Sequence, residues 1–148
     1  MINSYFIWDC KLWDFTGEDR SQSHGQVFYQ GSDAAIVMYD TTAVATFENV
    51  PRWINSFREI IQTEVPVFVV GNKIEEPGRV VTEEMAEELC EKYGEKCYSA
   101  FVDAKYSLNI NNLMDCILRT INGEEVFRTK PREVKSARNV GKNPNKFE

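Results

Sequence analysis

Two short segments are apolar along almost their whole length, and they constrain the fold more than any other feature of the sequence. Ala34–Tyr39 reads AAIVMY and Val65–Gly71 reads VPVFVVG, and turn-forming residues bound both. A strand with one face in water alternates apolar and polar residues, whereas a nearly continuous apolar strand is buried on both faces. Such strands belong to parallel sheets covered by helices. The sequence therefore predicts an α/β domain.

Two further strands are predicted from β-branched and aromatic content, at Tyr5–Trp13 and Lys96–Val102. Between the second and third predicted strands, apolar residues at helical spacing predict a helix over Phe47–Thr63. Pro51 would break a helix interior, but with Asn49 as the N-cap it falls in the first turn. Strand and helix thus alternate along the chain.

Two more helices carry recognisable end signals. One begins at the N-cap Thr82 and ends at Gly94, and the other begins at Asn109 or Asn111 and ends at Gly123. Alternation of this kind implies right-handed crossovers and a mainly parallel sheet with helices on both faces.

Composition narrows the class of protein. A chain of 148 residues with 43% hydrophobic content suits one domain with its own core. No apolar run is long enough to cross a bilayer and the first residues lack a secretory pattern, so we expect a cytoplasmic protein, at most transiently at membrane surfaces. The cysteines form no C-x-x-C pair and have no histidine beside them, which argues against zinc and a disulfide framework. They are Cys10, Cys90, Cys97 and Cys116.

Charge separates the end of the chain from the rest. Residues 1–127 carry 10 Lys and Arg against 21 Asp and Glu, whereas residues 128–148 carry 7 against 2. The end is also polar and without hydrophobic periodicity. We therefore predict a domain over residues 1–123 and a basic, disordered tail over residues 124–148.

Polar clusters follow three of the predicted strands. Asp14–Glu18 follows the first, Gly71–Glu75 the third and Asp103–Lys105 the fourth. Ligands of a parallel sheet bind beyond the carboxyl ends of its strands. The three clusters are therefore expected to converge on one ligand site.

These clusters also carry a resemblance to a known family. WDFTGEDR, Trp13 to Arg20, resembles the W-D-T-A-G-Q-E-R segment of the Ras superfamily, and of its Rab branch in particular. Asn72–Glu75 resembles N-K-x-D, Asp103–Lys105 resembles S-A-K, and FYQGSDAAIVMYDTTAVATFENVPRWI is similar to the Rab stretch between them. Each motif alone is weak, but three in order at strand ends are strong. An unrelated α/β domain with chance motifs is the least favoured alternative.

The resemblance implies roles for the first cluster. Asp14 would hold Mg²⁺ through water, and the Gly17 N–H would touch the γ-phosphate of GTP. Glu18 stands at the catalytic glutamine position, where an ionised carboxylate is repelled by the phosphate, so slow hydrolysis is expected. The alternative for Asp14 is a turn former after an edge strand.

The second cluster would recognise the guanine base. Asn72 and Lys73 would frame it, with the lysine stem along the nucleotide. Glu75 would accept hydrogen bonds from the ring N–H and the exocyclic amine, the edge at which guanine differs from adenine. It is one methylene longer than the aspartate of the family. The alternative is a plain Asn-Lys turn.

The third cluster would complete the base site. The Ala104 N–H would donate to the guanine O6 and Lys105 would brace the loop. Asp103 replaces the serine of the family and brings a negative charge.

One family motif is not found in the sequence. The sequence contains no G-x-x-x-x-G-K-[ST], and the first predicted strand of this chain corresponds to the third strand of the family. The resemblance therefore implies a truncated P-loop NTPase (Ras-like) fold without the first two family strands, the first helix, the phosphate loop and switch I. The missing first family strand would leave a gap in the sheet. Each buried backbone group left unpaired at this gap costs about 1–3 kcal/mol. The chain is either a fragment of a longer GTPase, which we favour, or a short protein that closes the gap by rearrangement or by pairing with another chain.

Two functions follow. The first is a Rab-like GTP-binding switch of vesicle trafficking, incomplete at its N-terminus and inactive as this chain. The second is a non-catalytic module that binds Rab-type effectors or regulators through Trp13, Phe28, Tyr29 and switch II, although a core role explains these aromatics equally well. No nucleic-acid partner is expected, and without a cysteine after Cys116 no prenyl anchor is expected.

Overall fold

The sheet has three parallel strands. The computed structural model describes residues 9–15, 29–61 and 64–124. Within them β1 (Ala35–Asp40), β2 (Val67–Asn72) and β3 (Cys97–Phe101) lie side by side in the order β1-β2-β3. Val67 of β2 is level with Ala35 of β1 and with Cys97 of β3. The predicted parallel sheet is confirmed, and all three carboxyl ends lie at one edge.

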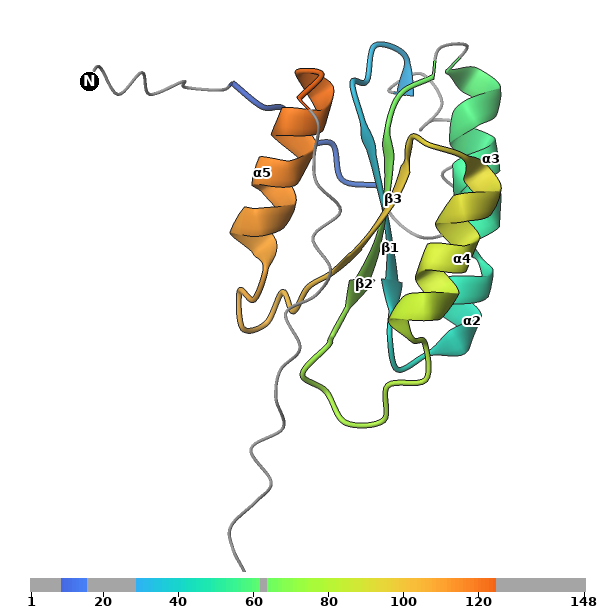
Figure 1. Ribbon diagram of the computed structural model, residues 1–148, viewed down its shortest axis with the longest axis vertical. Coiled ribbons are helices and arrows are strands. Elements are labelled where there is room, and N and C mark those ends of the chain that lie inside the picture. Colours follow the sequence, from blue (N-terminus) through green and yellow to red (C-terminus); the bar gives the residue numbers. More distant parts are fainter. Residues whose placement is uncertain (1–8, 16–28, 62–63, 125–148) are drawn as a thin grey trace, which may run out of the picture.

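Helices cover both faces of this sheet, as predicted. Four are described: α2 (Val44–Glu48), α3 (Val50–Ile60), α4 (Glu83–Tyr93) and α5 (Ile110–Ile121). In Figure 1, α5 lies on one side of the strands, and α2, α3 and α4 lie on the other. None of the helices in the described ranges is long and apolar enough to span a bilayer.

The helix ends follow local sequence signals. Asn49 occupies the N-cap position of α3 and Pro51 lies in its first turn, as predicted, although the chain makes a separate short helix, α2, before it. The side chain of Asn49 does not cap α3, because its Nδ2 donates to the Ala45 carbonyl 3.1 Å away. Thr82 does cap α4, since its hydroxyl accepts from the Met85 N–H.

The core is split between the two faces of the sheet. One cluster packs beneath α3 and α4 and includes Val37, Ile54 and Phe57, and the other packs beneath α5 and includes Phe68 and Val70. β2 is the central strand and its residues from Val67 to Val70 are at most 1% exposed. Burying each such side chain stabilises the fold by about 1.5–3 kcal/mol. The prediction of a strand buried on both faces is confirmed for β2.

The same prediction is wrong for part of β1. Met38 lies on the α5 side of the sheet, because side chains two apart on a strand share a face and Ile36 packs beneath α5. Its side chain is nevertheless 52% exposed. Within the described sheet β1 has one neighbouring strand, so it is an edge that α5 covers only in part.

The predicted strand at Tyr5–Trp13 is wrong over its described part. Residues 9–15 have no regular structure and are exposed, Leu12 by 73%. A strand exists only when its backbone groups pair with a neighbour. Within the described ranges, residues 9–15 pair with no neighbouring strand.

Candidate functional site

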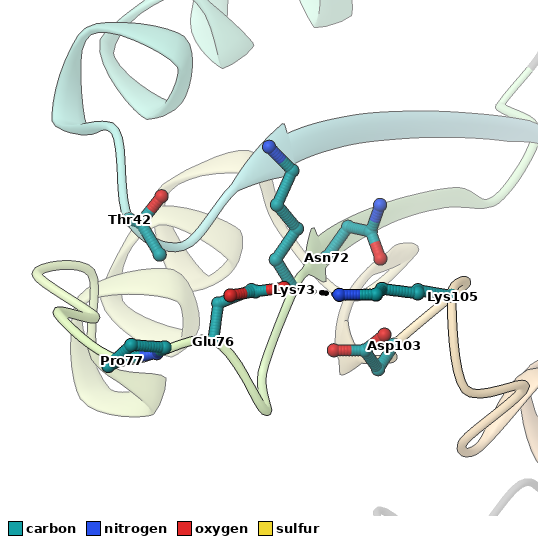
Figure 2. Close-up of a pocket in the computed structure, with 7 residues that line it drawn as sticks. All are labelled: Thr42, Asn72, Lys73, Glu76, Pro77, Asp103 and Lys105. Atoms are coloured by element: carbon teal, nitrogen blue, oxygen red, sulfur yellow. Dashed lines mark hydrogen bonds and ion pairs between the residues drawn. The ribbon is translucent and has the colours of Figure 1, made fainter.

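Two of the three polar clusters meet in a pocket at the carboxyl ends of the strands. The pocket has a volume of about 340 Å³. It lies between the loop that follows β2 and the loop that follows β3, and Figure 2 shows the lining side chains gathered around it. The lining residues are Thr42, Asn72, Lys73, Glu76, Pro77, Asp103 and Lys105.

Lys73 joins the β2 loop to the end of β1. Its ammonium group forms an ion pair with Asp40, and its carbonyl accepts from the Thr41 hydroxyl at 3.2 Å. Asp40 Oδ1 also accepts from the N–H and the hydroxyl of Thr42, at 2.8 and 2.7 Å. These hydrogen bonds, with Lys73 the strongest influence, lower the pKa of the Asp40 carboxyl from 3.8 to about 2. Asp40 is thus a charged anchor at physiological pH.

Asp103 connects the β2 and β3 loops from within. It is 2% exposed. Its Oδ2 accepts from the Glu75 N–H at 3.1 Å and its Oδ1 from the Tyr106 N–H at 3.2 Å. A buried carboxylate that accepts backbone N–H groups makes charge-assisted hydrogen bonds, which are about twice as strong as neutral ones. The negative charge that replaces the serine of the family therefore holds the two loops together.

Asn72 makes the second connection between these loops. Its Oδ1 accepts from the Ala104 N–H at 3.0 Å. This is the N–H that the resemblance assigns to the guanine O6, so a base would have to share or displace the bond. The role of Ala104 stays a prediction.

Lys105 and Glu76 face each other across the pocket. Their charged groups are 3.1 Å apart, as the dashed line in Figure 2 marks. Lys105 also lies 5.0 Å from the centre of the Tyr106 ring. Hydrogen bonding to Tyr106 and then to Glu76 raises the pKa of Lys105. The ion pair links the β3 loop to the β2 loop, and the predicted role of Lys105 in the base site stays a prediction.

Sequence reasoning missed four residues of this region, Asp40, Thr42, Glu76 and Pro77. The motif directed attention to Glu75, whose side chain is exposed and is not among the residues that line the pocket, whereas the next residue, Glu76, lines it. A signal for Asp40 and Thr42 was present: the polar run after Ala34–Tyr39 ends a predicted strand just as the other clusters do.

The first cluster is not brought to the pocket in the part that the structure describes. Asp14 is exposed. Its neighbour Phe15 packs edge-on against Tyr29, 5.3 Å between ring centres, and Tyr29 packs against Phe57. Tyr29 precedes β1, so this segment lies near the amino ends of the strands. Gly17 and Glu18 lie outside the described residues, and the predicted roles of all three stay predictions.

The predicted partner-binding aromatics divide between surface and core. Trp13 is 58% exposed. Tyr29 is half-buried and packs against the cluster beneath α3 and α4. Burial raises the pKa of its hydroxyl. Phe28 lies outside the described residues.

Comparison with known proteins agrees with this architecture. The family model "Ras family" matches residues 7–123. The chain is 32% identical to "Ras-related protein Rab7" of Prunus armeniaca over 128 residues, which cover 80% of this chain and 60% of the relative.

Two other relatives match the chain with similar identity and coverage. "Ypt/Rab-type GTPase YPT7" of Saccharomyces cerevisiae is 32% identical over 74% of this chain and 55% of its own length. "GTP-binding protein yptV5" of Volvox carteri is 34% identical over 79% of this chain and 62% of its own length. The chain thus spans less than two thirds of the length of these relatives. With the parallel sheet and the loops at its carboxyl edge, these matches show that the chain belongs to the Ras superfamily of small GTPases, in its Rab-like branch.

Proposed function

We propose that this chain carries the base-recognising part of a Rab-like GTP-binding switch that acts in vesicle trafficking. The observation that carries the proposal is the pocket in which Asn72, Lys73, Asp103 and Lys105 meet. Its volume of about 340 Å³ falls in the range of small-molecule sites. The relatives named "Ras-related protein Rab7" and "GTP-binding protein yptV5" support this assignment.

Base selection follows from the groups around the pocket. Guanine presents an N–H and an amine where adenine presents an acceptor and a C–H, so a carboxylate on that edge favours guanine. Glu75 is the residue that the motif assigns to this role, and Glu76 supplies a second carboxylate within the pocket wall. Asn72 and Lys73 frame the base, and the Ala104 N–H donates to O6 when the base shares or displaces its bond to Asn72. Their loops are held in place by Asp103 before any ligand binds.

The proposed site has few groups that would bind the phosphates of the nucleotide. The sequence contains no G-x-x-x-x-G-K-[ST], the loop whose backbone N–H groups cradle phosphates in P-loop proteins. The resemblance alone assigns the Mg²⁺ contact to Asp14, through water, and the γ-phosphate contact to the Gly17 N–H, because the described residues 9–15 lie near the amino ends of the strands, away from the pocket. Glu18 in place of glutamine makes hydrolysis slow. We therefore expect this chain to hold GTP or GDP only weakly and to be inactive as an enzyme.

Equilibrium binding of a fluorescent GDP analogue with Mg²⁺ tests this proposal. We expect no saturable binding by the 148-residue chain at concentrations on the order of 1 μM. Magnesium-dependent binding at that concentration would contradict the proposed weakness of the phosphate site.

A second function is favoured by two exposed apolar residues near the start of the chain. Leu12 is 73% exposed and Trp13 is 58% exposed. Neighbouring exposed apolar side chains of this size mark protein-binding surfaces. The chain would then be a non-catalytic module for Rab-type effectors or regulators, in the cytoplasm and transiently at membranes. Tight nucleotide binding in the assay above would contradict this function as well.

A further inference from the structure

Two buried thiols lie against each other at the end of the sheet opposite the pocket. Cys90 is in the last turn of α4 and Cys97 is the first residue of β3. They are 4% and 2% exposed and belong to the same apolar cluster beneath α3 and α4. A side-chain hydrogen bond links Cys90 and Cys97. The fold therefore presents two sulfur atoms to each other in a site that is otherwise apolar.

A positive charge lies near this thiol pair. Arg58, at the end of α3, donates from Nη2 to the Tyr93 carbonyl at 3.0 Å, and its guanidinium lies 5.2 Å from the Tyr93 ring centre. The hydrogen bond from Cys90 lowers the pKa of Cys97, the Arg58 charge acts in the same direction, and burial opposes both. A hydrogen-bond donor and a nearby cation are the features that give a cysteine thiolate character.

The other two cysteines lack this environment. Cys10 is exposed in an irregular segment. Cys116 lies in α5, on the opposite face of the sheet, and burial raises the pKa of its thiol. They provide internal controls for any chemistry at the pair.

We propose that Cys90 and Cys97 form a redox-sensitive dithiol, which hydrogen peroxide oxidises to an intramolecular disulfide that ties the end of α4 to the start of β3. The Cys97 thiolate attacks the O–O bond, so that a sulfur–oxygen bond forms and hydroxide leaves. The Cys90 sulfur then attacks the sulfenic acid, the S–S bond forms and the second oxygen leaves as water. The two thiols lose two electrons, and the peroxide is reduced to two molecules of water.

The oxidant reaches the pair through the turn that covers it. Gly94, Glu95 and Lys96 are exposed. Three backbone hydrogen bonds hold this turn: Gly94 N–H to Glu91 at 3.2 Å, Cys97 N–H to Gly94 at 3.1 Å and Val67 N–H to Lys96 at 2.9 Å. Local opening of so short a turn exposes the sulfurs without global unfolding. Oxidation of the pair is therefore slower than oxidation of Cys10.

Peptide mapping after treatment with hydrogen peroxide tests the proposal. Trypsin cleaves after Arg79, Lys92, Lys96 and Lys105, so Cys90 falls on peptide 80–92 and Cys97 on peptide 97–105. The double variant Cys10→Ser with Cys116→Ala removes the other thiols. In this variant we expect the two peptides to become linked and both thiols to disappear, and dithiothreitol to restore them.

Two results would overturn the proposal. One is that both thiols of this variant persist after peroxide treatment, and the other is that Cys97 becomes sulfinic acid without a linked peptide. Wild-type chain provides the same readout if the variant fails to fold. The variant Cys90→Ala with Cys97→Ala is the matched control, and in it no intramolecular link should form.

A second measurement separates the effect of the fold from closeness in sequence. In glutathione redox buffers, we expect the folded chain to form the disulfide at a ratio of reduced to oxidised glutathione about tenfold or more above that needed by the urea-unfolded chain. Equal ratios in both states, or a lower ratio in the folded state, would show that the fold does not favour the bond.

Discussion

At the scale of single residues, the site depends on two carboxylates that connect loops. Asp103 binds the N–H groups of Glu75 and Tyr106 from inside the protein, and Asp40 binds Lys73 and Thr42 at the rim. The motif pattern identified Asp103 only as a substituted serine and did not identify Asp40. A sequence motif shows which residue types follow a strand, but hydrogen-bond partners from another loop depend on how the loops fold together.

Replacing Asp103 should weaken the whole domain. In Asp103→Ala two partly buried hydrogen bonds, from the N–H groups of Glu75 and Tyr106, lose their acceptor, which costs about 1–3 kcal/mol in the free energy of unfolding. Urea unfolding followed by circular dichroism measures this change. The matched control is Asp33→Ala, an exposed aspartate, which should change stability by less than about 0.5 kcal/mol. Equal effects of the two substitutions would show that Asp103 does not brace the loops.

Asp40 should make the free energy of unfolding of the domain sensitive to acid. Its pKa is lowered from 3.8 to about 2 in the folded chain, so its contribution to stability is complete above pH 3.8 and is lost as the pH falls toward 2. The difference in free energy of unfolding between wild type and Asp40→Asn should therefore shrink over that interval. Urea titrations at several pH values measure it. A difference that stays constant with pH would contradict the assigned pairing with Lys73.

At the scale of elements, local signals predicted some features and non-local contacts decided others. Thr82 and Pro51 were placed correctly from the sequence because a cap or a proline acts within one helical turn. The segment Tyr5–Trp13 has the composition of a strand, yet its described part is irregular. Whether such a segment becomes a strand depends on a neighbour to pair with, which composition does not reveal.

The packing of β2 against β1 leads to a prediction at Gly71. A Cβ at this position would lie 2.7 Å from the Tyr39 hydroxyl oxygen and 3.0 Å from the Phe101 ring. Gly71→Ala should therefore cost about 1–3 kcal/mol through overpacking.

Tyr39→Phe supplies the partner variant. It removes the oxygen that the new Cβ would meet, a buried hydroxyl with no hydrogen-bond partner among the described residues. The cost of Gly71→Ala, measured by thermal and urea unfolding, should be smaller in the Tyr39→Phe background. An unchanged cost in the double variant would show that the Tyr39 hydroxyl is not the source of the clash.

At the scale of the whole molecule, the sheet brings two separate loops to one pocket. The parallel direction of the strands and the carboxyl-end position of Asn72 and Asp103 could be predicted, because they follow from apolar runs and motif order. The choice of Glu76 over Glu75 as a pocket residue could not, since it depends on the course of a loop held by Asp103. The exposure of Met38 likewise depends on how far α5 reaches over β1.

The central claim is that the β2 and β3 loops form a guanine-selective pocket. Titration of ¹⁵N-labelled chain with guanosine monophosphate, observed by two-dimensional NMR, tests it without requiring a phosphate loop. At ligand concentrations on the order of 1 mM we expect the amide signals of Lys73, Ala104 and Lys105 to shift with guanosine monophosphate and not with adenosine monophosphate. Equal shifts with both nucleotides, or none with either, would contradict the claim.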